Sequence, residues 1–343
     1  MKLSCIMANY NTDVKMLTEA LESILRQSYL DFELIVVDDA STDNSKEVLE
    51  HYAEIDDRVR IIENDNNLGL AYSLNRAIKS SKGDYIARMD TDDIAIANRF
   101  EIQVKYLDEN PDIDICGSFA RVFGAKNYFS ITPFYGKEFC KVQLLYSSCL
   151  IHPTVMIRRK FLEDSNLLYN TNYLCSQDFE LWSRAIEYGN IAMINQVLLY
   201  YRVHNGQISS KKRLLQRNYA IEICKNQIEK IIKDISDEQM EIHLVLCGHN
   251  ELTNSNVENV FKWINNLIAH NKEIKVYDSY VLRKMLYNRM FNILMKSSLS
   301  SRSKLKVLLR HKSLLSITNI YSVLYRINYP IWNRRGLSKR EPF

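Results

Sequence analysis

Residues 87–96 read ARMDTDDIAI and place three carboxylates, those of Asp90, Asp92 and Asp93, within four positions between two apolar runs. Ionised carboxylates this close repel one another, and they lose hydration where the end of a buried strand is partly covered. The cluster is therefore costly unless a metal ion or a nearby Arg or Lys neutralises it, or unless the acids stay in solvent. Carboxylate oxygens are ligands that suit Mg²⁺ and Mn²⁺.

Polar residues also follow two earlier apolar runs, in ANYN at residues 8–11 and in VVDDASTDNS at residues 36–45. Helix capping explains any one such turn, and Asp43 or Ser45 suits that role. Because ligands bind beyond the carboxyl ends of parallel strands, three polar turns of this kind together predict a binding site at one edge of a sheet.

Short runs rich in branched and aromatic residues predict the strands that carry these turns. Segments with apolar residues at helical spacing separate the runs, as in Leu17, Leu21 and Ile24. The alternation predicts an α/β fold with a mostly parallel central sheet flanked by helices on both faces. The expected strands are residues 3–8, 32–37, 59–63, 85–89 and 113–119.

The alternation stops near residue 120, where the chain becomes rich in loops and aromatic residues. The segment SQDFELWSRAIEYG predicts a helix with Ser176 as its cap and Gly189 as its end, and IAMINQVLLYYRVHN predicts two short strands. From about Lys211 to Arg326 the periodicity is helical. We therefore expect a helical C-terminal extension.

The composition is that of an ordinary folded protein, because 46% of the 343 residues are hydrophobic and 25% are charged. The seven cysteines are scattered without Cys-x-x-Cys spacing, which predicts reduced thiols and no structural zinc. The first apolar run is too short for a signal peptide, and no stretch approaches the roughly 18 apolar residues of a membrane-spanning helix. These features predict a cytoplasmic protein.

Charge is distributed unevenly along the chain. From Lys275 to Phe343 there are 15 Lys and Arg against two acidic residues, whereas the whole chain has a net charge of only +4. A basic tail on an acidic body suits a polyanion, either nucleic acid or an anionic membrane surface. Basic and apolar residues mix at helical spacing here, so helices at a membrane interface and helices packed on a catalytic domain are both open interpretations.

In their order along the chain, these motifs resemble glycosyltransferase family 2, the inverting family with the GT-A fold. The resemblance covers roughly residues 1–210 and rests on SCIMANYN, ALESILRQSYLDFELIVVDDASTDNS, NNLGLAYSLNRAIKSSKGDYIARMDTDD, HPTVMIRR, QDFELWSRAIEYG and YRVHNGQIS. It implies a catalytic domain at residues 1–210 that passes a sugar from a nucleoside diphosphate to an acceptor hydroxyl. Its nucleotide-sugar-binding half would be residues 1–120 and its acceptor half residues 121–210, followed by a basic helical region at residues 211–343.

The resemblance implies that the donor nucleotide lies at the ends of the first two strands. Asp39 would contact uracil or ribose with Asp38 as its support, and an Asp favours a uridine donor because uracil N3–H donates to a carboxylate. The donor would be a UDP-sugar of the glucose, galactose or N-acetylhexosamine type. Further implied donor-site residues are Ala8, Tyr10, Asn67, Gly69 and Asn75.

The same resemblance gives different roles to the three acidic residues of ARMDTDDIAI. Asp90 would lie near the ribose, and Asp92 would hold Mn²⁺ or Mg²⁺ between the two phosphates with Asp93 assisting. The cation would offset the negative charge that develops on the departing nucleoside diphosphate. The alternative is an acidic cap on the helix that starts near Ala97, and it applies most readily to Asp93.

Inversion requires a base opposite the leaving diphosphate, and Asp178 in SQDFELW matches the aspartate that serves as base in the family. A first-turn Asp stabilised by the helix dipole is the alternative. The resemblance also implies that Arg202 and His204 lie on a segment that closes over the diphosphate. His152 and Trp182 are candidate acceptor contacts, for which core packing is the alternative.

The acceptor implied by the resemblance is a glycan or a polyprenyl-diphosphate-linked sugar, used in surface polysaccharide or lipopolysaccharide synthesis at the cytoplasmic face of the inner membrane. Three other protein classes fit parts of the sequence. A sugar-phosphate nucleotidyltransferase requires a glycine-rich basic loop that ANYNTDVKM lacks, and a receiver-like signalling domain requires an acidic pair after the first strand. The acidic body argues against a nucleic-acid-binding protein.

Overall fold

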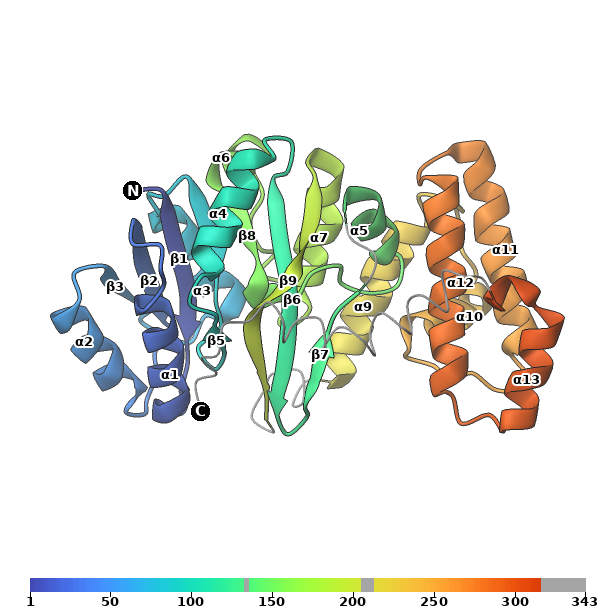
Figure 1. Cartoon of the computed structure of the whole chain (residues 1–343), viewed down its shortest axis with the longest axis horizontal. Helices are drawn as coiled ribbons and strands as arrows, with labels where there is room; N and C mark the ends of the chain where they lie inside the picture. The colour runs from blue at the N-terminus through green and yellow to red at the C-terminus, as the bar shows by residue number, and fades with distance from the viewer. Residues whose placement is uncertain (133–135, 205–212, 316–343) are drawn as a thin grey trace. The chain divides into compact units, whose positions relative to one another are not determined.

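The computed structural model describes residues 1–132, 136–204 and 213–315. The chain forms two compact units, which are described separately below (Figure 1): Met1–Ser130 with Ser148–Ala220, and Ile131–Ser147 with Ile221–Phe343. The predicted domain limits at residues 120 and 210 remain predictions, and residue 210 lies outside the described residues.

The first unit is built on a nine-stranded sheet in the order β3-β2-β1-β4-β8-β6-β9-β5, with β7 paired to β6. The first four strands in this order are parallel, and β6 pairs with β9 in parallel, whereas β5, β7 and β8 run antiparallel to their neighbours. The strands are β1 Leu3–Asn9, β2 Phe32–Asp38, β3 Val59–Glu63, β4 Tyr85–Arg88, β5 Ile94–Ala95, β6 Ile115–Gly124, β7 Tyr128–Ser130, β8 Met156–Arg158 and β9 Ile191–Val203.

Helices cover both faces of this sheet, as predicted. Alternate side chains of a strand point to opposite faces, so the apolar side chains of both faces have to be buried. Leu3, Cys5 and Met7 of β1 join a buried cluster with residues of α1 and α4. The helix α3 packs against β1 and β2, and its buried residues lie outside that cluster, so it covers the other face. The helices of this unit are α1 Val14–Leu25, α2 Ser45–Ile55, α3 Leu70–Ser80, α4 Arg99–Glu109, η1 His152–Thr154, α6 Arg159–Asp164 and α7 Gln177–Tyr188.

The structure differs from the sequence-based prediction in the last part of this unit. The segment predicted as two short strands is the single strand β9, which follows β6 along most of its length through a register shift. Helix α7 lies where it was predicted, but the Ser176 side chain makes no capping hydrogen bond and its Oγ lies 3.5 Å from the Gln216 carbonyl oxygen. Ser176 has a positive φ of 60°, so its side chain is not directed as in an ordinary N-cap.

The second unit is helical, which confirms the predicted C-terminal extension within the described residues. Helix α9, Arg213–Ile228, leads into it, and α10 begins with a capping box between Ser236 and Gln239. Its core is apolar, with Leu244, Ile264 and Leu282 almost fully buried. The other elements are α5 Lys137–Gln143, α10 Asp237–Cys247, α11 Val257–Ile274, α12 Ser279–Lys296, α13 Ser301–Arg310 and η2 Lys312–Leu315.

Each helix in the described part of the chain is too short or too polar to cross a bilayer. The last part of the predicted basic tail, residues 316–343, lies outside the described residues.

Candidate active site

The polar turns predicted from the sequence meet at the carboxyl edge of the parallel strands β1, β2 and β4. Asn9 at the end of β1 is paired in register with Asp38 at the end of β2. The backbone N–H of Met89, directly after β4, donates to the Ile6 carbonyl of β1 at 3.1 Å. The register of these adjacent strands brings the three turns together.

Asn9 is a buried link between the first two turns. Its Nδ2 lies 2.8 Å from Asp38 Oδ1, 3.1 Å from Ser41 Oγ and 3.0 Å from Ser45 Oγ. The Ser41 hydroxyl donates to Asp38 Oδ1 at 2.6 Å, and the Ser41 backbone N–H donates to Oδ2 at 3.0 Å. Both oxygens of the Asp38 carboxylate therefore hold the turn after β2.

Asp39 holds the loop that leads into α3. Its Oδ1 accepts from Asn64 Nδ2 at 2.5 Å and from the Leu68 backbone N–H at 2.9 Å, and its Oδ2 accepts from the Gly69 backbone N–H at 2.8 Å. Gly69 has φ 89° and ψ 160°, a conformation that residues with a Cβ rarely adopt. The glycine thus lets the backbone N–H groups point at the carboxylate.

Three other predicted donor-site residues lie near the surface. Tyr10 follows β1 and is half exposed, Ala8 is partly exposed at the end of β1, and Asn67 is exposed in the loop before α3. Each of them is accessible to a ligand at the strand ends.

Arg88 is the main positive charge beside Asp90, Asp92 and Asp93. Its side chain is only 3% exposed, and its Nη2 forms an ion pair with Asp90 Oδ1. Burial raises the pKa of Asp90, and the charge of Arg88 opposes that rise. Within the described part of the chain, Nε and Nη1 of Arg88 have no hydrogen-bond partner. A buried guanidinium with two unpartnered nitrogens, Nε and Nη1, is suited to receive oxygen atoms of a ligand.

The short strand β5 pairs with β9 and brings the end of β9 to Asp92 and Asp93. His204 Nε2 lies 2.9 Å from Asp92 Oδ2, and Arg202 Nε donates to the Asp92 carbonyl at 2.7 Å. The guanidinium of Arg202 also pairs with Glu19 Oε2 of α1 at 2.5 Å. Arg202 and His204 therefore bind the acidic cluster itself.

Asp93 is fully buried and does not cap α4, whose N-cap is Asn98. Its Oδ1 accepts from the Arg202 backbone N–H at 2.7 Å, whereas its buried Oδ2 has no hydrogen-bond partner within the described residues. Burial, followed by the charges of Asp90 and Asp92, raises its pKa well above the ordinary value. An unpaired buried oxygen of this kind is favourable if the carboxyl is protonated or if a cation lies beside it.

A divalent cation fits this cluster. One carboxylate oxygen from each of Asp90, Asp92 and Asp93 lies within 4.8 Å of the others, and the unpaired Asp93 Oδ2 is among the oxygens available. His204 Nε2 contacts Asp92 beside this group. Carboxylate oxygens with one imidazole suit Mn²⁺, and the oxygens alone suit Mg²⁺.

Asp178 lies in the first turn of α7, and the pKa of its carboxyl is raised. Burial raises its pKa, and the Phe179 backbone N–H and the charge of Arg88 oppose that rise. Its Oδ2 lies 3.5 Å from Ser148 Oγ. The charge of Asp178 contributes to the raised pKa of Asp90, so the two carboxyls are electrostatically coupled across the site. A carboxylate with raised proton affinity is suited to act as a general base.

Asn75 holds the backbone of Tyr169. Its amide makes two reciprocal hydrogen bonds with the Tyr169 backbone, at 2.8 and 2.9 Å. The Tyr169 hydroxyl in turn lies 2.7 Å from His152 Nε2, and burial lowers the pKa of His152 well below its ordinary value. Trp182 is fully buried with its ring beside His152. His152, Tyr169 and Trp182 thus form one packed group.

Sequence reasoning missed Arg88, Asn9 and Tyr169. Arg88 carried a usable signal, because a residue two positions before Asp90 at the end of a strand lies on the same face. Nothing in the sequence around Tyr169 indicates its contact with His152.

Known proteins share both the sequence and the fold of this site. The sequence model described as Glycosyl transferase family 2 matches residues 4–166. An uncharacterized glycosyltransferase of Haemophilus influenzae is 32% identical over 245 residues, which are 68% of this chain and 75% of the relative. The chain belongs to glycosyltransferase family 2. It is therefore a glycosyltransferase, as predicted, and the three other protein classes weighed above are set aside.

A further relative is the UDP-Glc:alpha-D-GlcNAc-diphosphoundecaprenol beta-1,3-glucosyltransferase WfgD of Escherichia coli. It is 30% identical over 214 residues, which cover 61% of this family 2 chain and 80% of the relative.

Among solved structures, S. aureus TarS 1–349 in complex with UDP-GlcNAc has a TM-score of 0.59 at 18% identity, over 99% of this chain and 93% of that one. The mannosyltransferase PcManGT from Pyrobaculum calidifontis, in complex with GDP-Man and Mn²⁺, has a TM-score of 0.53 at 15% identity, over 98% and 88% of the two chains. At these identities the likeness is one of fold. The predicted GT-A fold of this family 2 enzyme is confirmed.

Proposed function

We propose that this family 2 enzyme transfers the sugar of a UDP-sugar, with inversion, to a hydroxyl of a glycan or of a polyprenyl-diphosphate-linked acceptor. The observation that carries the proposal is the buried Arg88–Asp90 ion pair at the carboxyl edge of the sheet, where Nε and Nη1 of Arg88 have no hydrogen-bond partner within the described residues. Asp178, a carboxyl whose pKa is raised by burial, is the base of the proposal. A base on one side and a charge-binding cluster on the other are the two parts that a displacement at an anomeric carbon requires.

The nucleotide side of the proposal rests on the turns after β1 and β2. Asp38 and Asp39 are buried and ordered by several hydrogen bonds, and the side chain of Tyr10, which follows β1, is exposed. Two of the similar proteins support uridine in particular, because WfgD is named for UDP-Glc and TarS was solved with UDP-GlcNAc. The diphosphoundecaprenol in the name of WfgD supports a lipid-linked acceptor.

Asp178 would act on the acceptor. As the acceptor oxygen bonds to the anomeric carbon, its proton passes to the Asp178 carboxylate, and the bond from the anomeric carbon to the diphosphate oxygen breaks on the opposite face. Burial raises the proton affinity of this carboxylate, while the charge of Arg88 keeps the ionised form accessible. His152 and Tyr169 are held in one arrangement by their mutual hydrogen bond.

Asp92 and His204 would hold a divalent cation, with Asp93 as a further oxygen ligand. When bound, the cation would offset negative charge on the diphosphate. Arg88 has the N–H groups of Nε and Nη1 left to donate to donor oxygens, and its ion pair favours the ionised form of Asp90, which would lie beside the ribose.

The donor is tested by incubating the purified full-length protein with Mn²⁺ and each of UDP-glucose, UDP-galactose, UDP-N-acetylglucosamine and UDP-N-acetylgalactosamine. We expect one donor to be hydrolysed slowly without acceptor, at least about tenfold faster than the others, because a pocket that hydrogen-bonds specific sugar hydroxyls discriminates strongly. The release of UDP is the measurement, and GDP-mannose is the matched control. Preference for GDP-mannose, or no donor binding with Mn²⁺, would contradict the proposal.

We also propose that α13 contributes to binding an anionic membrane at its cytoplasmic face. On this helix Arg302, Leu305, Lys306 and Leu309 follow the spacing of a single helical face. Leu305 and Leu309 are 56% and 62% exposed, and Arg302 and Lys306 are exposed beside them. Apolar side chains flanked by basic ones are typical of helices that lie in a membrane interface.

Vesicle sedimentation tests this surface. We expect the full-length protein to bind phosphatidylglycerol-containing vesicles about tenfold more tightly than phosphatidylcholine vesicles, because each basic residue near an anionic surface contributes about 1 kcal/mol. The double variant L305S/L309S should lose most of this binding, whereas Leu30→Ser, at an exposed leucine of the first unit, should not. Equal binding to both lipids, or full binding by the double variant, would exclude α13 as the contact.

A further inference from the structure

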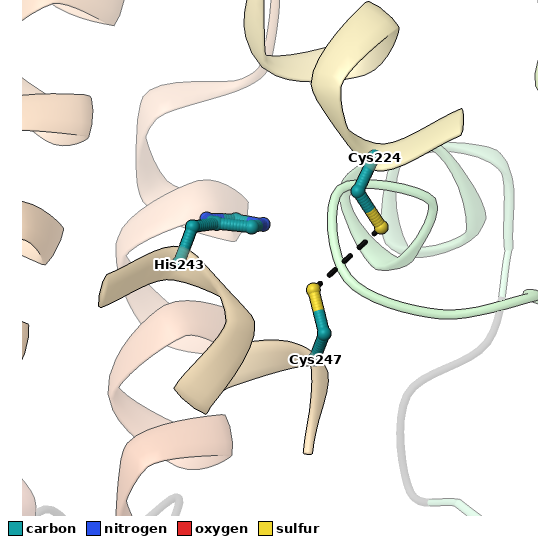
Figure 2. A group of neighbouring side chains, drawn as sticks. All are labelled: Cys224, His243 and Cys247. Carbon is teal, nitrogen blue, oxygen red and sulfur yellow. Dashed lines mark hydrogen bonds between the residues drawn. The ribbon is translucent and has the colours of Figure 1, made fainter. Parts of the chain in front are cut away.

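Cys224, His243 and Cys247 form a cluster within the second unit that the proposed transfer reaction does not use (Figure 2). Cys224 lies on α9 and Cys247 is the last residue of α10, and their Sγ atoms are 3.6 Å apart and hydrogen-bonded. His243 lies one helical turn before Cys247, so the two side chains share a face of α10. The cluster therefore brings two thiols and an imidazole together from separate helices.

The hydrogen bonds of His243 argue against a metal ion at this cluster. The Trp263 Nε1–H donates to His243 Nδ1 at 3.0 Å, and His243 Nε2 lies 2.8 Å from the Leu145 carbonyl oxygen. An indole N–H only donates and a carbonyl only accepts, so the imidazole is neutral with its proton on Nε2. Neither ring nitrogen then has a lone pair left for a metal.

The number of possible ligands also argues against a metal ion. Among the described residues the cluster has three members, whereas a structural zinc site generally has four protein ligands. A disulfide, by contrast, requires only these two sulfur atoms from the protein, together with an oxidant.

We propose that Cys224 and Cys247 are a site of reversible oxidation, and that a peroxide converts them into a disulfide linking α9 to α10. Cys247 is the residue that the oxidant reaches, since it is partly exposed and is followed by the exposed residues Gly248 and His249, whereas Cys224 is 1% exposed. A disulfide requires the sulfur atoms to approach from 3.6 Å to about 2.05 Å, which side-chain rotation supplies over this range.

The two thiols differ in their pKa, as the attacking and the resolving cysteine of such a reaction should. The hydrogen-bonded contact between the two sulfur atoms lowers the pKa of Cys247 well below that of an ordinary thiol and raises the pKa of Cys224. Cys5 and Cys116 of the first unit behave differently, because burial raises the pKa of each thiol to about 12. A low pKa and partial exposure are the features of reactive cysteines.

The reaction balances with the peroxide as the only oxidant. The Cys247 sulfur attacks one peroxide oxygen, the O–O bond breaks, and water leaves with a proton from the medium, which gives a sulfenic acid. The Cys224 sulfur then attacks the Cys247 sulfur, the S–O bond breaks, and a second water leaves with the Cys224 proton. The two thiols lose two electrons to the peroxide, and a dithiol reductant reverses the step.

The test uses the reduced full-length protein with a small molar excess of hydrogen peroxide. We expect the intact mass to fall by two hydrogen atoms, non-reducing peptide mapping to recover a Cys224–Cys247 cross-link, and dithiothreitol to restore both thiols. In Cys224→Ser the sulfenic acid at Cys247 has no partner, so a dimedone adduct should appear there. In Cys247→Ser and Cys247→Ala, oxidation of Cys224 should slow by roughly tenfold or more.

Cys140→Ser is the matched control, because Cys140 is a buried cysteine of the same unit outside the cluster, and this variant should form the cross-link like the unaltered protein. The absence of a cross-link in protein that circular dichroism shows to be folded would overturn the proposal. One equivalent of Zn²⁺ that protects both thiols from alkylation, and is lost in Cys224→Ser, would overturn it in favour of a metal site.

Discussion

Asp178→Asn is expected to lower the rate of sugar transfer by a factor of about 10²–10⁴, the usual contribution of a general base. The affinity for the UDP-sugar should change by much less, because the amide keeps the shape of the carboxylate and because the proposed donor site is formed by the turns after β1, β2 and β4. The measurements are transfer to the acceptor under saturating donor and the dissociation constant of the donor by calorimetry. A rate within about threefold of the unaltered enzyme would exclude Asp178 as the base.

The control for this variant is Glu187→Gln, the same chemical change at an exposed position on the same helix. It should leave transfer unchanged. Loss of transfer in both variants would indicate disturbance of α7 rather than loss of a base.

The pH profile of the same reaction separates a base from a structural carboxylate. Only the ionised form of Asp178 can accept the acceptor proton, so kcat/KM should fall as the pH falls through its pKa. Burial raises that pKa above 3.8, so the acid limb should lie at a higher pH than for an ordinary Asp. In Asp178→Asn the residual rate should not show this limb.

The location of the candidate site could be predicted from the sequence because strand ends are marked by abrupt changes from apolar to polar residues. Asp38, Asp39 and Asp90 each follow such a change, and parallel strands place these ends on one edge. The partner of Asp90 was also within reach of the sequence, because Arg88 lies two residues earlier on the same strand face.

The partners of Asp92 and Asp93 could not be predicted in this way. His204 is 112 residues from Asp92 along the chain, and their contact depends on pairing between β9 and β5, a strand of only two residues. So short a strand has no detectable alternation of apolar and polar residues. The cluster of Cys224 and Cys247 was missed for a similar reason, since it forms by packing of two helices and has no sequence spacing of its own.

Asp92→Asn should remove the dependence of donor binding on Mn²⁺. Without the carboxylate, the diphosphate of the donor has to be held by Arg88 and by the remaining ligands alone, and we expect kcat/KM for transfer to fall by about 10²–10³-fold. Calorimetry of the UDP-sugar with and without Mn²⁺ gives a readout that does not depend on turnover. In the unaltered enzyme Mn²⁺ should tighten binding, and in the variant the two titrations should coincide.

His204→Gln distinguishes a cation ligand from a residue that merely orients Asp92. If His204 holds the cation, the variant should retain part of the Mn²⁺ effect but require a higher Mn²⁺ concentration, because one ligand of the set is lost while Asp92 and Asp93 remain. Asp65→Asn, an exposed acid in the loop before α3, is the control for a general loss of negative charge and should behave like the unaltered enzyme. A normal Mn²⁺ requirement in both Asp92→Asn and His204→Gln would mean that the cation is held by other ligands than Asp92 and His204.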